Sequence, residues 1–387
     1  MKFNRKSFFL FISILFVISL VTACTGVETT FFSALQSAKP GGKLIYLHEH
    51  ALHELDLSTR QTTDLSAASD FLTQKGTGFY LSLTPDGKIL VFDGYDPLMG
   101  CSTFRRIYIC EETGPNGFFT YDLSLGAVNL IRPFTLSNIS LSPDGSQLAF
   151  TVLEYDTPDY QVHLKISPID GGVPTSLSNG HVVDSAPSWS PDGEWIAFVR
   201  SHSPDPDAAP CTPAPGLFDS CTLPYPGLYL IHPDGSGYHK LLDNIRQFYA
   251  PYNQPAWSSD GQTLAVIAGE QVPQVALVNI DDGSTKVIQD LSPSSIPVWS
   301  PTQRLLAFTI GGVEDTDSYI LLYDDSTSSW RVLAQGASPV WSPDGQWLAY
   351  LDVKVNEPNQ LKVVSLDGKT LVDLGVSDVS AKPIWVK

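Results

Sequence analysis

The chain has 387 residues, with 23 Lys and Arg against 41 Asp and Glu, and a formal net charge of −18. This acidic balance excludes the positive surface that nucleic-acid binding needs, and anionic lipid headgroups would repel the folded chain. Hydrophobic residues make up 43% of the sequence, which is ample for a packed core.

The N-terminus has the pattern of an export signal. Lys2, Arg5 and Lys6 precede an apolar run from Ser7 to Ser19, which is short for a membrane span. We therefore set this segment aside from the fold.

The apolar run is followed by Val21-Thr-Ala-Cys24, which resembles the lipobox of bacterial lipoproteins. The resemblance implies that residues 1–23 are a lipoprotein signal peptide, that Cys24 is the lipid attachment site and that residues 24–42 form a tether. It implies an exported protein on the cell membrane or the outer membrane, facing the periplasm or the exterior. Thr25 after the cysteine favours the outer membrane. The alternative is an ordinary signal peptide that ends near a cysteine.

A strand–turn motif then recurs along the chain. It reads Leu83-Thr-Pro-Asp-Gly87, Leu141-Ser-Pro-Asp-Gly145, Trp189-Ser-Pro-Asp-Gly193, Trp257-Ser-Ser-Asp-Gly261, Trp299-Ser-Pro-Thr-Gln303 and Trp341-Ser-Pro-Asp-Gly345. Trp257, Trp299 and Trp341 lie 42 residues apart, which is the length of one four-stranded propeller blade.

Each part of the motif has a structural explanation. Proline fixes φ, aspartate bonds the local backbone and glycine accepts a positive φ, so Pro-Asp-Gly predicts a tight turn. The tryptophan is large enough to fill the wedge between neighbouring blades. We therefore assign the aspartates to turns rather than to catalysis or calcium binding.

The two ends of the chain indicate how the ring closes. Pro383-Ile-Trp385 starts a repeat that is cut off, and the strands expected at Lys43–Tyr46 and Leu52–Leu57 supply its missing part. The sequence thus predicts an all-β fold over residues 43–387, a β-propeller of seven four-stranded blades closed by N- and C-terminal strands. Six or eight blades remain alternatives.

These repeats resemble the propeller of the TolB family and the related N-terminal propeller of dipeptidyl peptidase IV-like enzymes, over about residues 43–387. The resemblance implies a WD-type propeller. Two departures separate this chain from TolB. TolB carries an additional N-terminal α/β domain and has six blades, so a role in the Tol–Pal system is not implied.

Two interruptions of the repeat carry cysteine pairs. Gly94–Gly117 contains Cys101 and Cys110, and Ser201–Gly227 contains Cys211 and Cys221. An even number of cysteines in an exported chain favours disulfides, and local pairing is the most economical of three connectivities. Reduced thiols or a metal site are the alternatives, although no ligand spacing supports a metal.

Both interruptions, and shorter additions such as Tyr155–Tyr160, are expected after the second strand of their blades and hence on one face. Long loops collected on one face are typical of binding sites. The residues that we expect to contact a partner are Phe104, Arg105, Arg106, Tyr155, Tyr160, Phe218 and Tyr225. Arg105 and Arg106 could accept a carboxylate, although local pairing with Glu111 and Glu112 is the simpler expectation.

Histidines gather in the first hairpin, at His48, His50 and His53. His48 and His50 would share a strand face and could be two metal ligands. Because no third ligand is placed by the sequence, we expect solvent-facing histidines, and neither a metal nor another cofactor.

No hydrolase, zinc-protease or phosphate-loop signature occurs in the sequence. We therefore expect a monomeric binding or scaffold module for a protein or peptide of the cell envelope, attached to the membrane through its lipid alone. A carbohydrate-active propeller, binding or cleaving a polysaccharide, and a purely structural envelope component are the alternatives. A catalytic site assembled from residues of several blades would have no local sequence motif. The absence of motifs therefore does not decide whether the chain is an enzyme.

Overall fold

The computed structural model describes residues 39–48, 51–65, 77–94, 101–104, 107–110, 117–133, 139–156, 159–180, 182–201, 226–243, 254–269, 272–288, 291–311, 317–354, 357–379 and 382–387. Contacts divide the chain into two compact units, Met1–Pro40 and Gly41–Lys387. The second unit carries the fold. Over the described ranges its regular elements are β-strands, and no helix is long and apolar enough to span a membrane.

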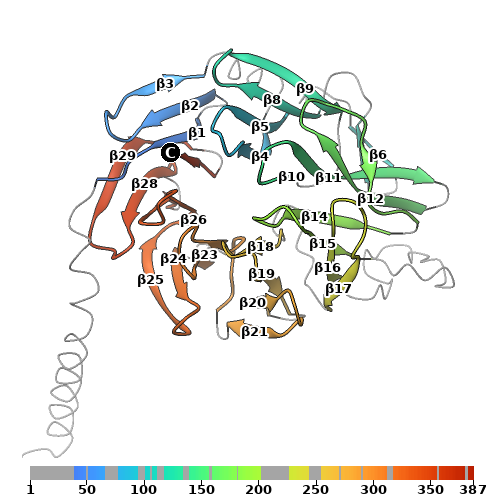
Figure 1. Cartoon of the computed structure of the whole chain (residues 1–387). Helices are drawn as coiled ribbons and strands as arrows, with labels where there is room; N and C mark the ends of the chain where they lie inside the picture. The colour runs from blue at the N-terminus through green and yellow to red at the C-terminus, as the bar shows by residue number, and fades with distance from the viewer. Residues whose placement is uncertain are drawn as a thin grey trace, which may run out of the picture. The chain divides into compact units, whose positions relative to one another are not determined.

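The second unit is a β-propeller of seven four-stranded blades arranged in a ring, as the sequence predicted (Figure 1). All strand pairs within the blades are antiparallel, and from blade 3 round to blade 2 the first strands of successive blades contact each other around the centre. We number the blades in chain order and give their strands from the innermost to the outermost.

Blade 1 consists of β30 (Ile384–Val386), β1 (Lys43–His48), β2 (Ala51–Asp56) and β3 (Thr62–Asp64). Blade 2 consists of β4 (Thr77–Leu83), β5 (Ile89–Gly94), β8 (Gly117–Asp122) and β9 (Ala127–Pro133), and blade 3 of β10 (Ser140–Leu141), β11 (Gln147–Asp156), β12 (Asp159–Pro168) and β13 (Thr175–Ser176). Blade 4 consists of β14 (Asp184–Trp189), β15 (Ile196–Arg200), β16 (Gly227–Ile231) and β17 (His239–Leu242), and blade 5 of β18 (Ala256–Trp257), β19 (Thr263–Ala268), β20 (Gln274–Asn279) and β21 (Thr285–Ile288). Blade 6 consists of β22 (Val298–Trp299), β23 (Leu305–Gly311), β24 (Ser318–Asp324) and β25 (Ser329–Gln335), and blade 7 of β26 (Ala337–Trp341), β27 (Trp347–Asp352), β28 (Gln360–Ser365) and β29 (Leu371–Val376). A separate hairpin comprises β6 (Cys101–Phe104) and β7 (Ile107–Cys110).

The recurring motif forms the turn between the first and second strands of a blade. In blade 4, Ser190 Oγ donates to Asp192 Oδ1 at 2.5 Å, and the same carboxylate accepts the Glu194 N–H at 3.0 Å. Ser190 Oγ in turn accepts the Trp195 N–H at 2.9 Å. The same three bonds recur in the turns of blades 2, 3, 5 and 7. These aspartates therefore hold the turns together, as expected.

The motif tryptophans join neighbouring blades. The indole N–H of Trp257 donates to the carbonyl of Ser188 in the preceding blade at 3.0 Å. Trp299 reaches Ala256 O at 3.1 Å and Trp341 reaches Val298 O at 3.0 Å in the same way. Each bond satisfies a buried donor while the ring fills the wedge between two sheets.

Blade 1 closes the ring with strands from both ends of the chain. β30 pairs with β1, so that Trp385 lies opposite Leu44 and Val386 lies opposite Lys43. Gly42, with φ of +83°, precedes this pair, and a Cβ there would lie 2.2 Å from Val386 O. Only glycine fits this close approach. The predicted closure by terminal strands is confirmed.

The core lies between the sheets rather than at the centre of the ring. Leu228 and Leu230 of blade 4, for example, pack in one cluster with Leu264 and Val266 of blade 5. Small alanines on the second strands of the blades are fully buried, as at Ala197 and Ala307.

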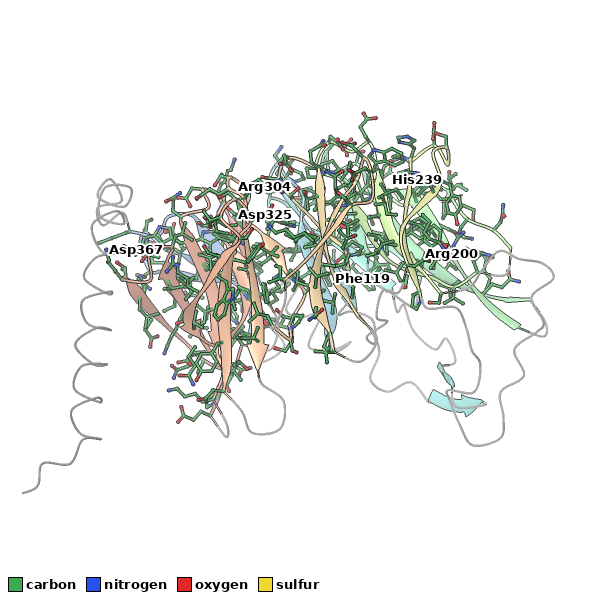
Figure 2. The ribbon with its side chains drawn as sticks, turned by 90° about the horizontal axis from the view of Figure 1, so that it is seen from below. Phe119, Arg200, His239, Arg304, Asp325 and Asp367 are labelled. Carbon is green, nitrogen blue, oxygen red and sulfur yellow. The ribbon has the colours of Figure 1, made fainter. Side chains whose placement is uncertain are left out.

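The ring has two different faces. Because successive strands are antiparallel, all turns between first and second strands and between third and fourth strands lie on one face, which we call the turn face. The ends of the second strands, such as His48, Gly94, Arg200 and Asp352, lie on the opposite face, which we call the loop face. Figure 2 shows Arg304, Asp325 and His239 toward one side of the blades and β6–β7 beyond the other.

Candidate functional site: the loop face

Both cysteine-bearing interruptions leave the propeller at the loop face. Gly94 and Gly117 are paired across β5 and β8, and Arg200 and Gly227 are paired across β15 and β16. Each interruption therefore starts and ends at neighbouring points between the second and third strands of its blade. The position predicted for these two segments is confirmed.

The first interruption contains the hairpin β6–β7. Its register places Cys101 opposite Cys110 and Phe104 opposite Ile107. Directly opposed antiparallel residues have Cα atoms about 4.5–5.5 Å apart, a separation that a disulfide can bridge. The disulfide itself stays a prediction. Cys24, Arg105, Arg106, Cys211, Cys221, Phe218 and Tyr225 lie outside the described residues.

Tyr155 and Tyr160 are strand residues, whereas we expected them in a loop. β11 and β12 are each ten residues long and pair without interruption up to Asp156 and Asp159. Tyr155 lies directly opposite Tyr160 in this register. The reason is that the aromatic and β-branched residues around them continue the hairpin. The two tyrosines still lie at the loop-face end of blade 3.

Of the three histidines of the first hairpin, the structure describes His48 and His53. His50 lies outside the described residues, and the ring near His48 is that of His53 on β2, with centroids 5.8 Å apart. His53 also stacks on Tyr46 at 5.5 Å. His48 Nδ1 is buried and has no hydrogen-bond partner among the residues that the structure describes. Within the described part of the chain, no group of three or more His, Cys, Asp or Glu side chains could hold a metal.

A buried ion pair lies where the second interruption begins. Arg200 donates to Asp184 through Nε at 2.6 Å and Nη2 at 2.9 Å, and the two side chains are 6% and 0% exposed. Arg200 Nη1 also donates to the hydroxyl of Tyr238 at 3.0 Å. Burial by itself would lower the pKa of Arg200, but the interactions with Asp184 and, less strongly, Tyr238 together raise it.

Aromatic rings enclose the same arginine. Its guanidinium carbon lies 5.0 Å from the ring centre of Tyr238, 5.3 Å from that of Phe198 and 5.6 Å from that of Tyr229. Tyr238 stacks on Tyr229 at 5.4 Å and is 42% exposed. Ser201, which follows Arg200 in the chain, donates its N–H to Val183 O at 3.0 Å. Arg200 thus fixes the start of the interruption.

Sequence reasoning missed this pair. Asp184 and Arg200 are 16 positions apart, and they meet because β14 and β15 pair them across a β-bulge between Ser185 and Ser188. The sequence does contain one indication of a buried ion pair. Arg200 is the charged last residue of an otherwise apolar strand and directly precedes an interruption. Such a charge needs a partner if it is buried.

The turn face is acidic. Asp86, Asp144, Asp192, Asp260 and Asp344 occupy its motif turns. In blade 6, where the turn lacks Asp-Gly, Arg304 binds Asp260 of blade 5 at 2.6 Å and Asp325 at 2.7 Å (Figure 2). Blade 6 lacks the aspartate bonds of the other motif turns, and Arg304 instead links its turn to blade 5. A surface of this charge would be repelled by anionic headgroups.

No protein-family model matches the chain. A stretch of 186 residues, 48% of the chain, is 25% identical to a Protein TolB homolog from Chlorobium luteolum. The match covers 34% of that relative, so the chain spans about a third of its length. The match supports a TolB-like propeller.

Solved structures with the same fold have different activities. Prolyl oligopeptidase B from Galerina marginata is 12% identical with a TM-score of 0.58, covering 89% of this chain and 51% of that one. An oligogalacturonate lyase in complex with manganese is 14% identical with a TM-score of 0.55, covering 82% of both chains. At this identity the likeness shows the fold alone.

Proposed function

We propose that the chain is an exported, lipid-anchored propeller whose loop face binds a protein or peptide of the cell envelope. The observation that supports this most is the placement of the two interruptions on the face opposite to the point where the chain enters the propeller. β1 starts at Lys43, which pairs with Val386 at the turn-face end of blade 1. A tether that ends at residue 42 therefore joins the turn face.

This arrangement suits a binding module attached to a membrane. The interruptions start and end on the face opposite to the one that the tether joins, so the propeller itself does not place them on the membrane side. The acidic turn face would be held off an anionic surface, which leaves attachment to the lipid on Cys24. The TolB-like fold is consistent with an exported protein with protein partners.

We propose disulfides between Cys101 and Cys110 and between Cys211 and Cys221. Each would close a short loop and reduce the conformational freedom that a partner would otherwise have to restrict. We assign binding rather than catalysis to this face.

Two deletions test the binding proposal in the full-length protein. Because Gly94 is paired with Gly117 and Arg200 with Gly227, residues 95–116 and residues 202–225 can each be replaced by a two-residue turn. We expect partners cross-linked in the native envelope to be lost, while the thermal midpoint stays near that of the parent. A matched control carries Leu125→Ser and Val173→Ser on the turn face.

Retention of every partner by both deletion variants, with the fold intact, would remove the binding proposal and favour a structural component. The anchor has its own test. Cys24→Ser should move the protein from the membrane fraction to the soluble fraction. Unchanged membrane attachment of this variant would overturn the lipid assignment.

A further inference from the structure

The connection from blade 3 to blade 4 is bound along one side to β12. It follows β13 and leads into β14 over residues 177–183, of which 181 lies outside the described residues. The N–H of Leu164 donates to Ser178 Oγ at 2.8 Å, and the N–H of Val162 donates to Val182 O at 2.9 Å. We call residues 177–183 the connector.

The other side of the connector holds the start of the second interruption. Ser201 donates its N–H to Val183 O at 3.0 Å, and Asp184, the next residue after the connector, binds Arg200 through two hydrogen bonds. Displacement of the connector would therefore disturb the residues from which the second interruption starts.

One buried histidine fixes the middle of the connector. His163 on β12 is 6% exposed, and its Nε2 lies 2.8 Å from Gly180 O. Its Nδ1 lies 2.8 Å from Glu154 Oε2 on β11. A carbonyl oxygen and a carboxylate oxygen can only accept, so both ring nitrogens must donate. Only the imidazolium form of histidine carries two N–H groups.

The surrounding charges keep the second acceptor ionised. Lys165 donates to the other oxygen of Glu154, and this bond, followed by the one from His163, lowers the pKa of Glu154. Asp184 and Arg200, at the end of the connector, form an ion pair with each other. A second histidine, His181, belongs to the connector itself and lies outside the described residues. The bonds around His163 thus form a complete set only while Glu154 is charged and His163 carries both protons.

We propose that doubly protonated His163 holds the connector against β12 through its two hydrogen bonds, an arrangement that we call the clasp. Loss of one proton from His163 then loosens the start of the second interruption. A neutral ring carries one N–H, so whichever nitrogen keeps it, the other presents a lone pair to an oxygen 2.8 Å away. The proton leaves to water. The effect on partner binding rests on the proposed function of the loop face, whereas the clasp itself does not.

Native-state hydrogen exchange of the wild-type protein without any partner tests the clasp. Histidines titrate between about pH 5 and 8. After correction for intrinsic exchange rates, we expect the protection of the Val162 and Ser201 amides to fall about tenfold between pH 5.5 and pH 8, which corresponds to about 1.4 kcal/mol for the loss of one hydrogen bond. Equal protection at the two pH values would overturn the proposal.

Two variants sharpen the test. His163→Gln should abolish the pH dependence at Val162 and Ser201. His239→Gln is the matched control, because that histidine also binds a carbonyl, Gly237 O at 2.7 Å, but lies on the turn-face side of blade 4. It should keep the wild-type response. A pH response that persists in His163→Gln would assign the proton to another group and overturn the clasp.

A failed clasp and a failed binding proposal can be told apart. Exchange is measured without a partner, so it reports on the clasp whatever the loop face binds. Partner capture at pH 5.5 and pH 8 then tests the consequence. Where exchange responds to pH and no partner is captured at either value, the clasp stands and the binding proposal falls.

Discussion

The indole nitrogen of Trp385 donates a hydrogen bond to the carbonyl of Gly41 at 2.9 Å, joining residues 344 positions apart. Its ring, 7% exposed, packs with residues of blades 1 and 7. Trp257, Trp299 and Trp341 each bond the preceding blade, whereas Trp385 bonds the segment that leads into its own. Trp385 therefore fastens residues 41–42, which lead into β1, to the ring.

Removal of this bond should destabilise the propeller. We expect Trp385→Phe to lower the free energy of unfolding by about 0.5–1.5 kcal/mol, because the hydrogen bond to the Gly41 carbonyl is lost. Trp385→Ala should cost about 3–5 kcal/mol through the cavity it leaves. Trp330→Phe is the control, since that ring is 52% exposed on an outermost strand and should cost less than about 0.5 kcal/mol. Denaturant unfolding measures all three, and equal losses for Trp385→Phe and Trp330→Phe would contradict the closure role.

The Asp184–Arg200 pair should behave as a coupled unit. Asp184→Asn or Arg200→Met should each cost about 3–5 kcal/mol, because either change leaves a buried charge without its partner. The double variant should cost much less than the sum of the two. The exposed pair Lys240–Asp243 is the control and should couple by less than about 1 kcal/mol. Additive losses at Asp184 and Arg200 in unfolding experiments would show that they do not act together.

The turn aspartates predict how stability responds to acid. Bonds from Ser142 and the Ser146 N–H lower the pKa of Asp144, and bonds from Ser58 and the Thr59 N–H lower that of Asp56 to about 2. A carboxyl whose pKa is lower in the folded state contributes stability above its unfolded pKa and loses it as the pH falls toward the folded value. The thermal midpoint should therefore drop as the pH falls from about 4 toward 2. A midpoint that rises over this range would refute the turn assignment.

Lys382 should lose its proton, and so react with amine reagents, at a lower pH than an ordinary lysine. It directly precedes Pro383 and the innermost strand β30, and although part of its side chain is exposed, the surrounding protein desolvates the ammonium group and lowers its pKa to about 8. Labelling by an amine-specific reagent, followed by mass spectrometry, should be half-maximal near pH 8.

Lys240 is the comparison for this labelling, because its bond to Asp243 raises its pKa and should delay its reaction. The folded state binds fewer protons at Lys382 than the unfolded state between about pH 8 and pH 10.4, so this group makes stability rise with pH there. If Lys382 and Lys240 reached half-maximal labelling at the same pH, desolvation of the Lys382 ammonium group would be contradicted.

The repeat made the architecture predictable because each turn is a local structure. Ser190 and Asp192 are two positions apart, so the residues that build the turn are read directly from the chain. The phase of the last repeat, at Trp385, likewise indicated which strands complete blade 1.

The contacts on the loop face could not be predicted in this way. Whether Asp184 meets Arg200 depends on a bulge, and whether His163 meets Gly180 depends on how the connector runs along β12. Neither follows from a periodic pattern. At Tyr155 and Tyr160 the repeat led to a wrong expectation. Because these residues exceed the repeat period we expected a loop, whereas aromatic residues favour strands and both lie in paired strands.

Site-specific photo-cross-linking in the native envelope tests most directly whether the loop face carries the binding surface. Photoreactive residues would replace Phe104 and Tyr225 in the two interruptions, and Leu125 and Val173, which are 77% and 87% exposed on the turn face. We predict a discrete cross-linked partner from Phe104 and Tyr225 and none from Leu125 and Val173. The same partner cross-linked from the turn-face positions, with none from the interruptions, would contradict binding at the loop face.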